Sequence, residues 1–261
     1  MRYGVCSGLD KAARVKLIKK SGFDYIETGF SGLSRESDEV FEAFKAALLE
    51  NDIRCEAANG FFPRDYLILD KDFDAAKFET YIENGMKRGA EIGLKTVVFG
   101  SGKARAIPDG MSYTEAFSRL ARFLGETVSP IAEKYGVTVV IEPLRKDESN
   151  IINTVKEGVI LALMSGKANI AGLGDIYHMI GAGDTYDDIV QLSGSIKHAH
   201  ISNPVGKNGD KRCYPLDKDE FDYKGFVDAL TKAGCTRCSI EAGTDDFDTE
   251  IVAAGKVLKS I

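Results

Sequence analysis

The feature that most constrains this chain is a regular alternation of short β-rich runs with longer amphipathic helical patterns. The β-rich runs are apolar or β-branched and are bounded by Gly, Asp, Asn or Pro, which is typical of buried parallel strands. The segments between them place apolar residues at helical spacing, most clearly over residues 38–51, 113–135, 222–233 and 249–260. The predicted strands are residues 3–7, 25–29, 53–57, 96–99, 138–142, 170–175, 196–201 and 239–241.

Eight such units in one chain favour a closed barrel. Dividing 261 residues by eight gives about 33 residues per unit, the size of a βα repeat with its crossover. No Pro/Ser-rich linker or charge block separates two domains, so we expect a single α/β domain over residues 1–261. The expected architecture is a (β/α)₈ TIM barrel with parallel strands. An open doubly wound sheet is the alternative, but the turn Cys6-Ser7-Gly8-Leu9-Asp10 lacks its glycine-rich phosphate motif.

Charge and composition limit the partners of the protein. The chain carries 34 basic and 40 acidic residues, a formal net charge of −6, which argues against binding nucleic acid. It has no apolar run of about 20 residues that could span a bilayer, and its N-terminus lacks the apolar core of a signal peptide. Five scattered cysteines suit reduced thiols. We therefore expect a cytoplasmic protein without nucleic-acid or membrane partners.

Polar residues stand at the ends of four of the last five predicted strands. Glu142, Asp175, His200 and Glu241 are 33, 25 and 41 residues apart, so the barrel should bring them to one mouth. Three carboxylates brought together repel one another unless a cation offsets them. The set is rich in oxygen and suits Mn²⁺, Mg²⁺ or Co²⁺ rather than a thiolate-type zinc site. The competing interpretation is that these residues only form salt bridges with lysines or arginines.

The three histidines all lie in two of these strand-end segments. His198 and His200 are two residues apart and should point to the same side of the sheet. We expect His200 to be a ligand, His198 to be a core residue beneath it, and His178 to contact substrate. Glu27 and Glu56, at the ends of the second and third strands, should either line the same mouth or form structural ion pairs.

These segments, taken in order, resemble the xylose isomerase-like sugar isomerases and epimerases. The similarity is strongest to the ketose 3-epimerases that act on tagatose or psicose. It covers the whole chain in element order. The matching residues are Glu142-Pro143-Leu144 with Glu148 and Asn153-Thr154, Asp175 with His178-Met179, His198-Ala199-His200, Arg212 with Pro215, and Ser239-Ile240-Glu241.

The resemblance implies roles for individual residues. Glu142, Asp175, His200 and Glu241 would hold one divalent ion, usually manganese in that group. Glu142 and Glu241 would also be catalytic, facing opposite sides of the sugar, whereas Glu148, His178 and Arg212 would bind substrate. That group often has Asn-Arg where this chain has Arg145-Lys146, and the segment 203–211 is rich in Gly and Lys. The extra positive charge suggests a phosphorylated or carboxylated substrate.

The expected function is a divalent-metal-dependent isomerase or epimerase of a sugar or sugar phosphate, with ketose 3-epimerase as the first choice. One glutamate would remove a proton beside a carbonyl and the other would return one through an enediolate. The sequence leaves aldose–ketose isomerisation and an inosose dehydratase-like lyase open, and also a non-catalytic sugar-binding barrel. A DNA-cutting endonuclease of the same barrel needs more than three histidines. The resemblance also implies a homodimer or homotetramer.

Overall fold

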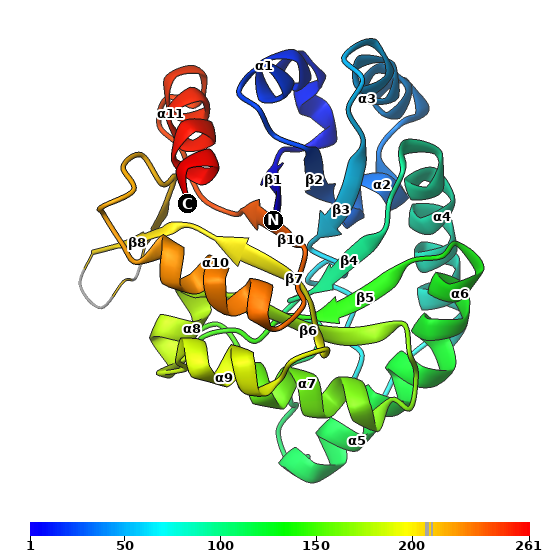
Figure 1. Cartoon of the computed structure of the whole chain (residues 1–261). Coiled ribbons are helices and arrows are strands. Elements are labelled where there is room, and N and C mark those ends of the chain that lie inside the picture. The colour runs from blue at the N-terminus through cyan, green and yellow to red at the C-terminus, as the bar shows by residue number, and fades with distance from the viewer. Residues whose placement is uncertain (207–208, 210) are drawn as a thin grey trace.

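The chain forms a closed barrel of parallel strands, shown in Figure 1 as a computed structural model that describes residues 1–206, 209 and 211–261. The strand order is β1-β10-β7-β6-β5-β4-β3-β2, and β1 closes the barrel by pairing with both β10 and β2. These strands are β1 Arg2–Cys6, β2 Tyr25–Gly29, β3 Cys55–Asn59, β4 Thr96–Phe99, β5 Thr138–Ile141, β6 Ile170–Asp175, β7 Ile196–Ile201 and β10 Arg237–Ile240.

Helices follow the strands and surround the barrel (Figure 1). A 3₁₀ turn, Leu9–Arg14, precedes the first of them. The helices are α1 Val15–Lys20, α2 Phe30–Arg35, α3 Asp38–Glu50, α4 Ala75–Ile92, α5 Tyr113–Phe123, α6 Ser129–Lys134, α7 Val155–Met164, α8 Ile176–Ala182, α9 Tyr186–Gln191, α10 Tyr223–Lys232 and α11 Phe247–Ser260. The predicted (β/α)₈ barrel is therefore confirmed, and the eight predicted strands match the barrel strands within a few residues.

Two features differ from the sequence-based expectation. The helix expected over 113–135 is divided into α5 and α6 by a π-helical turn, Leu124–Val128. Pro130 lies in the first turn of α6, where its missing N–H cannot donate to the preceding turn, so the hydrogen-bond pattern shifts there. A hairpin of β8 (Asn203–Val205) and β9 (Lys211–Cys213) also follows β7, in a segment where no strand was predicted. Lys207, Asn208 and Asp210 of that segment lie outside the described residues.

The barrel interior combines a small apolar cluster with polar side chains. Val98, Val140, Ala171 and Leu173 form a cluster separate from the main core between strands and helices. Polar side chains are also buried inside the barrel. Tyr25 and Ser239 hydrogen bond through their hydroxyl oxygens at 2.9 Å, and Ser239 Oγ lies 3.5 Å from His198 Nε2. This polar layer leads towards the strand ends where the candidate site lies.

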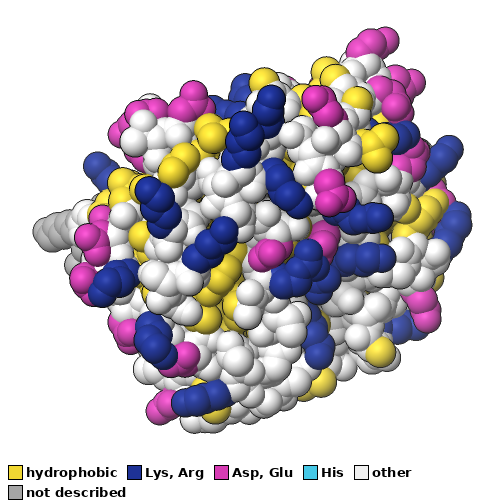
Figure 2. All heavy atoms as spheres, turned by 45° about the horizontal axis from the view of Figure 1, so that its top comes forward, with side chains coloured by type: hydrophobic (Ala, Val, Ile, Leu, Met, Phe, Trp, Pro, Cys, Tyr) yellow, Lys and Arg dark blue, Asp and Glu magenta, His cyan; other side chains and the backbone are white. Residues whose placement is uncertain are grey.

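The histidines are hidden from the outer surface. On the face shown in Figure 2, Lys and Arg side chains spread across the centre and no His side chain is visible. All three histidines are at most 1% exposed. None of the helices in the described part of the chain is long and apolar enough to cross a membrane.

Candidate metal centre

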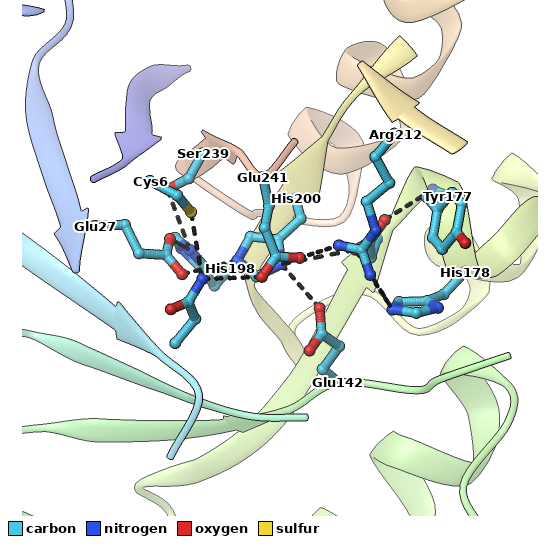
Figure 3. A network of polar contacts seen from close by, with 12 residues as sticks. Cys6, Glu27, Glu142, Tyr177, His178, His198, His200, Arg212, Ser239 and Glu241 are labelled. Atoms are coloured by element: carbon cyan, nitrogen blue, oxygen red, sulfur yellow. Dashed lines mark hydrogen bonds and ion pairs between the residues drawn. The ribbon is translucent and has the colours of Figure 1, made fainter. Parts of the chain in front are cut away.

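Four side chains converge where β5, β6, β7 and β10 end. Glu142 and Glu241 directly follow β5 and β10, Asp175 is the last residue of β6, and His200 is next to last in β7. One ligand atom from each of the four lies within 4.8 Å of the others. The predicted convergence is therefore observed, and the close view in Figure 3 shows Glu142 and Glu241 approaching His200 from different sides.

His200 lies at the centre of the cluster. Its Nδ1 atom is 2.9 Å from Glu142 Oε1 and 3.3 Å from Glu241 Oε2. Its Nε2 atom is 2.9 Å from Glu27 Oε1, and the other oxygen of Glu27 is 2.8 Å from His198 Nε2. A carboxylate that accepts the proton of one ring nitrogen directs the lone pair of the other nitrogen into the site. Glu27 therefore orients His200, and His198 is the buried core histidine that was expected.

The carboxylates are also held by neighbouring backbone and side chains. Asp175 caps α8, where its Oδ1 accepts a hydrogen bond from the Tyr177 N–H at 2.7 Å, so its position is set by the helix it begins. Glu241 Oε1 accepts a hydrogen bond from Asn59 Nδ2 at 2.9 Å. Gly100 leaves room for Glu142, because a Cβ atom there would lie 2.1 Å from Glu142 Oε2.

A buried arginine fixes the backbone beneath the cluster. Arg105 is fully buried, and its guanidinium donates to the carbonyl oxygens of Phe99 at 2.9 Å, Glu142 at 2.9 Å and Ile152 at 3.4 Å. Phe99 ends β4, whereas Glu142 and Ile152 belong to the segment that follows β5. Arg105 thus joins two neighbouring strand ends through carbonyl groups, with no carboxylate among its hydrogen-bond partners in the described residues.

The three residues expected to bind substrate lie beside the cluster. Arg212 on β9 is 3.2 Å from Asp175 Oδ2, also contacts Glu241, and has its Nη2 atom 2.7 Å from His178 Nε2. His178 Nδ1 lies 3.2 Å from the backbone N of Arg145 and 3.9 Å from Glu148 Oε1. A neutral imidazole has one acceptor nitrogen. The ring therefore satisfies only one of its two donor neighbours, and the other contact is open to replacement by a ligand.

The electrostatics of the cluster separate its two glutamates. Burial, together with the charge of Glu241, raises the pKa of Glu142 to about 7. Burial alone would also raise the pKa of Glu241, but the charges of His200 and Arg212 outweigh it and hold that pKa below its usual value. Burial alone would lower the pKa of His200, but the surrounding carboxylates raise it well above its usual value. Burial lowers the pKa of His178 to about 4 and keeps that ring neutral.

The donor set fits a divalent cation. Arg212 offsets one of the three formal negative charges of Glu142, Asp175 and Glu241, and a divalent ion would offset the other two. Carboxylate oxygens with one imidazole nitrogen are ligands for Mn²⁺, Mg²⁺ or Co²⁺ and also for Zn²⁺. Nδ1 of His200 faces the three carboxylates, and it is the ring nitrogen that would bind the ion once the ion displaces its proton.

Glu56 forms structural ion pairs, which was one of the two roles that the sequence left open. Its carboxylate is 2.7 Å from Arg2 Nη1 and 3.0 Å from Arg237 Nε. Arg2 and Arg237 are the first residues of β1 and β10, so Glu56 lies towards the end of the barrel opposite the cluster. Sequence reasoning gave no role to Asn59 or Arg105, and a polar residue at the end of β3 was the one available signal for Asn59.

Comparisons with known proteins agree with this fold. Residues 15–261 match the family described as xylose isomerase-like TIM barrel. The D-psicose 3-epimerase of Agrobacterium fabrum is 22% identical over 235 residues, which cover 85% of this chain and 80% of that protein. The structure of 3-keto-D-glucoside 4-epimerase from E. coli has a TM-score of 0.80 and 20% identity, with both chains fully covered. IOLI protein with a zinc atom bound has a TM-score of 0.75 and 19% identity, covering 100% of this chain and 96% of that one. The matched residues show that this chain belongs to the xylose isomerase-like TIM barrel family.

Proposed function

We propose that this protein is a divalent-metal-dependent sugar isomerase or epimerase, with epimerisation of a ketose at carbon 3 as the favoured reaction. The observation that carries the proposal is the convergence of Glu142, Asp175, His200 and Glu241 within 4.8 Å. Family membership supports it, as do the names of the relatives, two of which are epimerases of a sugar or a sugar derivative.

The two glutamates are suited to moving a proton. One carboxylate removes the proton from the carbon beside the carbonyl, and the electron pair of the broken C–H bond gives an enediolate. The other glutamate, in its protonated form, returns a proton to the opposite face of the same carbon, which inverts its configuration. Glu142 and Glu241 follow β5 and β10, which are not neighbours in the barrel, so they can reach a sugar from two sides.

The other residues bind and orient. Glu142, Asp175, His200 and Glu241 would hold the divalent ion, with Mn²⁺ as the first choice. A bound ion of this kind acts as a Lewis acid that stabilises negative charge on the carbonyl oxygen. Arg212 donates hydrogen bonds to sugar hydroxyls, and the neutral ring of His178 offers one donor and one acceptor. Glu148 accepts hydrogen bonds from the sugar hydroxyls. Glu27 keeps His200 in the required orientation.

The test is metal-dependent exchange of solvent deuterium into candidate ketoses, ketose phosphates and inososes. We expect Mn²⁺-loaded protein to place deuterium at carbon 3 of a ketose and to form the epimer, and chelation to stop both. Glu241→Gln should abolish epimerisation, because it removes the acid–base group on one face of the sugar and also a proposed ligand of the ion. Glu79→Gln, an exposed glutamate on α4, is the control and should exchange at the wild-type rate.

A different product would assign a different reaction to the same site. A dehydrated product from an inosose would indicate a lyase using the same glutamates, and an aldose would indicate proton transfer between adjacent carbons. Full epimerisation by Glu241→Gln would exclude the two-glutamate mechanism. Metal binding without exchange into any of the sugars would favour a sugar-binding barrel.

A further inference from the structure

A large cavity adjoins the cluster on the same end of the barrel. It has a volume of about 790 Å³ and is formed by the segments that follow β3, β4 and β5. Its apolar lining includes Phe62 and Leu144, and its size lies within the range of ligand sites. The mechanism proposed above uses none of its lining residues except Glu148.

Three cations line this cavity, one from each segment. Arg64 follows β3, Lys103 follows β4 and Lys146 follows β5. All three are exposed, and none forms an ion pair or a side-chain hydrogen bond with any residue that the structure describes. Their charges are thus available to a ligand, on a protein whose formal net charge is −6.

The acidic residues of the same lining do not neutralise these cations. Asp147 lies 3.5 Å from Arg145 Nε, which is outside the lining, and is paired there. Glu148 faces the other way, with its carboxylate 3.9 Å from His178 Nδ1. The cavity therefore has a cationic part and, at Glu148, a part that adjoins the metal cluster.

Backbone packing joins the walls of this cavity to the segments next to Glu142. Gly102 lines it, and a Cβ atom there would lie 2.7 Å from the Glu148 carbonyl oxygen and 2.9 Å from Leu144 Cδ1. The β4 and β5 segments are thus in close contact at Gly102, and Gly100 makes room for Glu142 two residues earlier. A ligand in the cavity would share these two segments with the cluster.

We infer that this cavity binds an anionic group, a phosphate or a carboxylate, carried by the sugar on a carbon remote from its carbonyl. The inference rests on the proposed function for the reacting end of the substrate. Arg64, Lys103 and Lys146 bind the anionic group. Glu148 and His178 contact the part of the sugar between that group and its carbonyl. The substrate class is thus a ketose phosphate or a keto-sugar acid, and a neutral ketose leaves three cations without a partner.

The first experiment compares activity on matched sugars. Deuterium exchange is measured with Mn²⁺-loaded protein on a hexulose, its 6-phosphate and the hexuluronate of the same configuration. We expect kcat/KM for one of the two anionic sugars to exceed that for the neutral hexulose by at least about tenfold. In the triple variant Arg64→Gln, Lys103→Gln, Lys146→Gln this preference should fall to within about twofold, with activity on the neutral hexulose unchanged. The anionic sugar with the higher kcat/KM shows whether the cavity prefers a phosphate or a carboxylate.

A matched variant separates the cavity from general electrostatics. Lys16→Gln, Lys20→Gln, Lys232→Gln removes the same charge from exposed positions on α1 and α10, outside the cavity. It should keep the wild-type preference. Equal losses in both triple variants would overturn the inference, because long-range attraction alone would then explain the preference.

Binding of an unreactive sugar tests the cavity independently of catalysis. Glucitol and glucitol 6-phosphate lack a carbonyl, and calorimetric titration of each measures the contribution of the phosphate. Tighter binding of glucitol 6-phosphate that is lost in the cavity variant supports the site even if no sugar exchanges deuterium, in which case the proposed function fails. Exchange into neutral ketoses without any preference for anionic ones, together with equal binding of the two glucitols, overturns the inference and leaves the proposed function intact.

Discussion

Glu56 and Glu142 are both nearly buried glutamates of the barrel, 7% and 5% exposed, yet they differ in the charge that surrounds them. Glu56 on β3 is bound by two arginines, which neutralise it and join β1, β3 and β10. Glu142 after β5 faces His200, Asp175 and Glu241, so it shares its surroundings with two further carboxylates. One end of the barrel thus pairs its buried carboxylate completely, and the other collects more carboxylates than Arg212 alone can offset.

This difference separates stability from function. A paired carboxylate favours folding on its own, whereas clustered carboxylates repel one another until a cation joins them. Stability at the Glu56 end should therefore be independent of metal. Stability at the Glu142 end should depend on it.

Glu142→Gln should have the largest effect, on turnover and on the response to metal. We expect a loss of at least about 10³-fold in turnover, because a proton-transfer group and a proposed ligand are lost together. Metal at about 100 times its dissociation constant would stabilise the wild type by about 2.7 kcal/mol. The rise in Tm that this stabilisation causes when metal is added should disappear in Glu142→Gln. Glu56→Gln is the control and should keep both activity and shift. An undiminished shift with Mn²⁺ in Glu142→Gln would contradict the proposed ligand set.

Arg105→Met should cause the largest loss of stability. The change removes three hydrogen bonds from a charged donor to buried carbonyl oxygens, of which those of Phe99 and Ile152 keep a backbone N–H as a second donor. We therefore expect a loss of at least about 3 kcal/mol in the free energy of unfolding. Urea unfolding measures it. Arg105→Lys should recover part of the loss, and the exposed Arg119→Met should change little. A loss below about 1 kcal/mol in Arg105→Met would show that water can replace the guanidinium.

Gly100→Ala should impair turnover more than folding. The new methyl group would overlap Glu142 Oε2 and force the carboxylate to move. A displacement of about 1 Å costs about 100-fold in rate. Gly29→Ala, at the end of β2 with nothing within 4 Å of its Cβ position, is the control. Equal turnover in the two variants would mean that Glu142 reaches its reactive position by another route.

Glu56→Gln should have the smallest effect, confined to stability and dependent on pH. Burial alone would raise the pKa of Glu56, but hydrogen bonds from Arg2 and Arg237 lower it below the ordinary value of 4.5. The stabilisation is therefore complete above pH 4.5 and is lost as the pH falls through the lowered pKa. Because Arg2 is half-exposed, we expect about 1 kcal/mol at pH 7 and less at pH 3, measured by thermal unfolding. A loss that does not shrink in acid would indicate that packing, not charge, holds Glu56.

The barrel and the convergence of the four strand-end residues could be predicted because neither depends on fine geometry. In a closed parallel barrel every strand ends at the same mouth, so polar residues at strand ends, such as Asp175 and His200, are expected to meet there. The helical patterns likewise follow from spacing alone. The π-helical turn Leu124–Val128 escaped prediction because the apolar stripe continues through it.

Residues that depend on register or on loop folding could not be assigned. Glu27 and Glu56 look equivalent in sequence, but β2 and β3 shift register between Ile26 and Glu27, and this local detail helps to decide which end each carboxylate reaches. Arg105 lies among polar and small residues that predict an exposed loop. Only the folded structure shows that its guanidinium turns inward to three carbonyl groups.

The hairpin that carries Arg212 has a consequence for how such a protein could change its substrate. The four clustered side chains come from the barrel wall, whereas Arg212 comes from β9, which pairs with β8 and is joined to the segment after β10 at Cys213 and Gly243. An exchange of the hairpin would therefore alter Arg212, the group proposed to contact the sugar, without altering the strands that hold the carboxylates. Selection, in nature or in the laboratory, can act on this short insert to redirect specificity while the reaction chemistry is inherited unchanged.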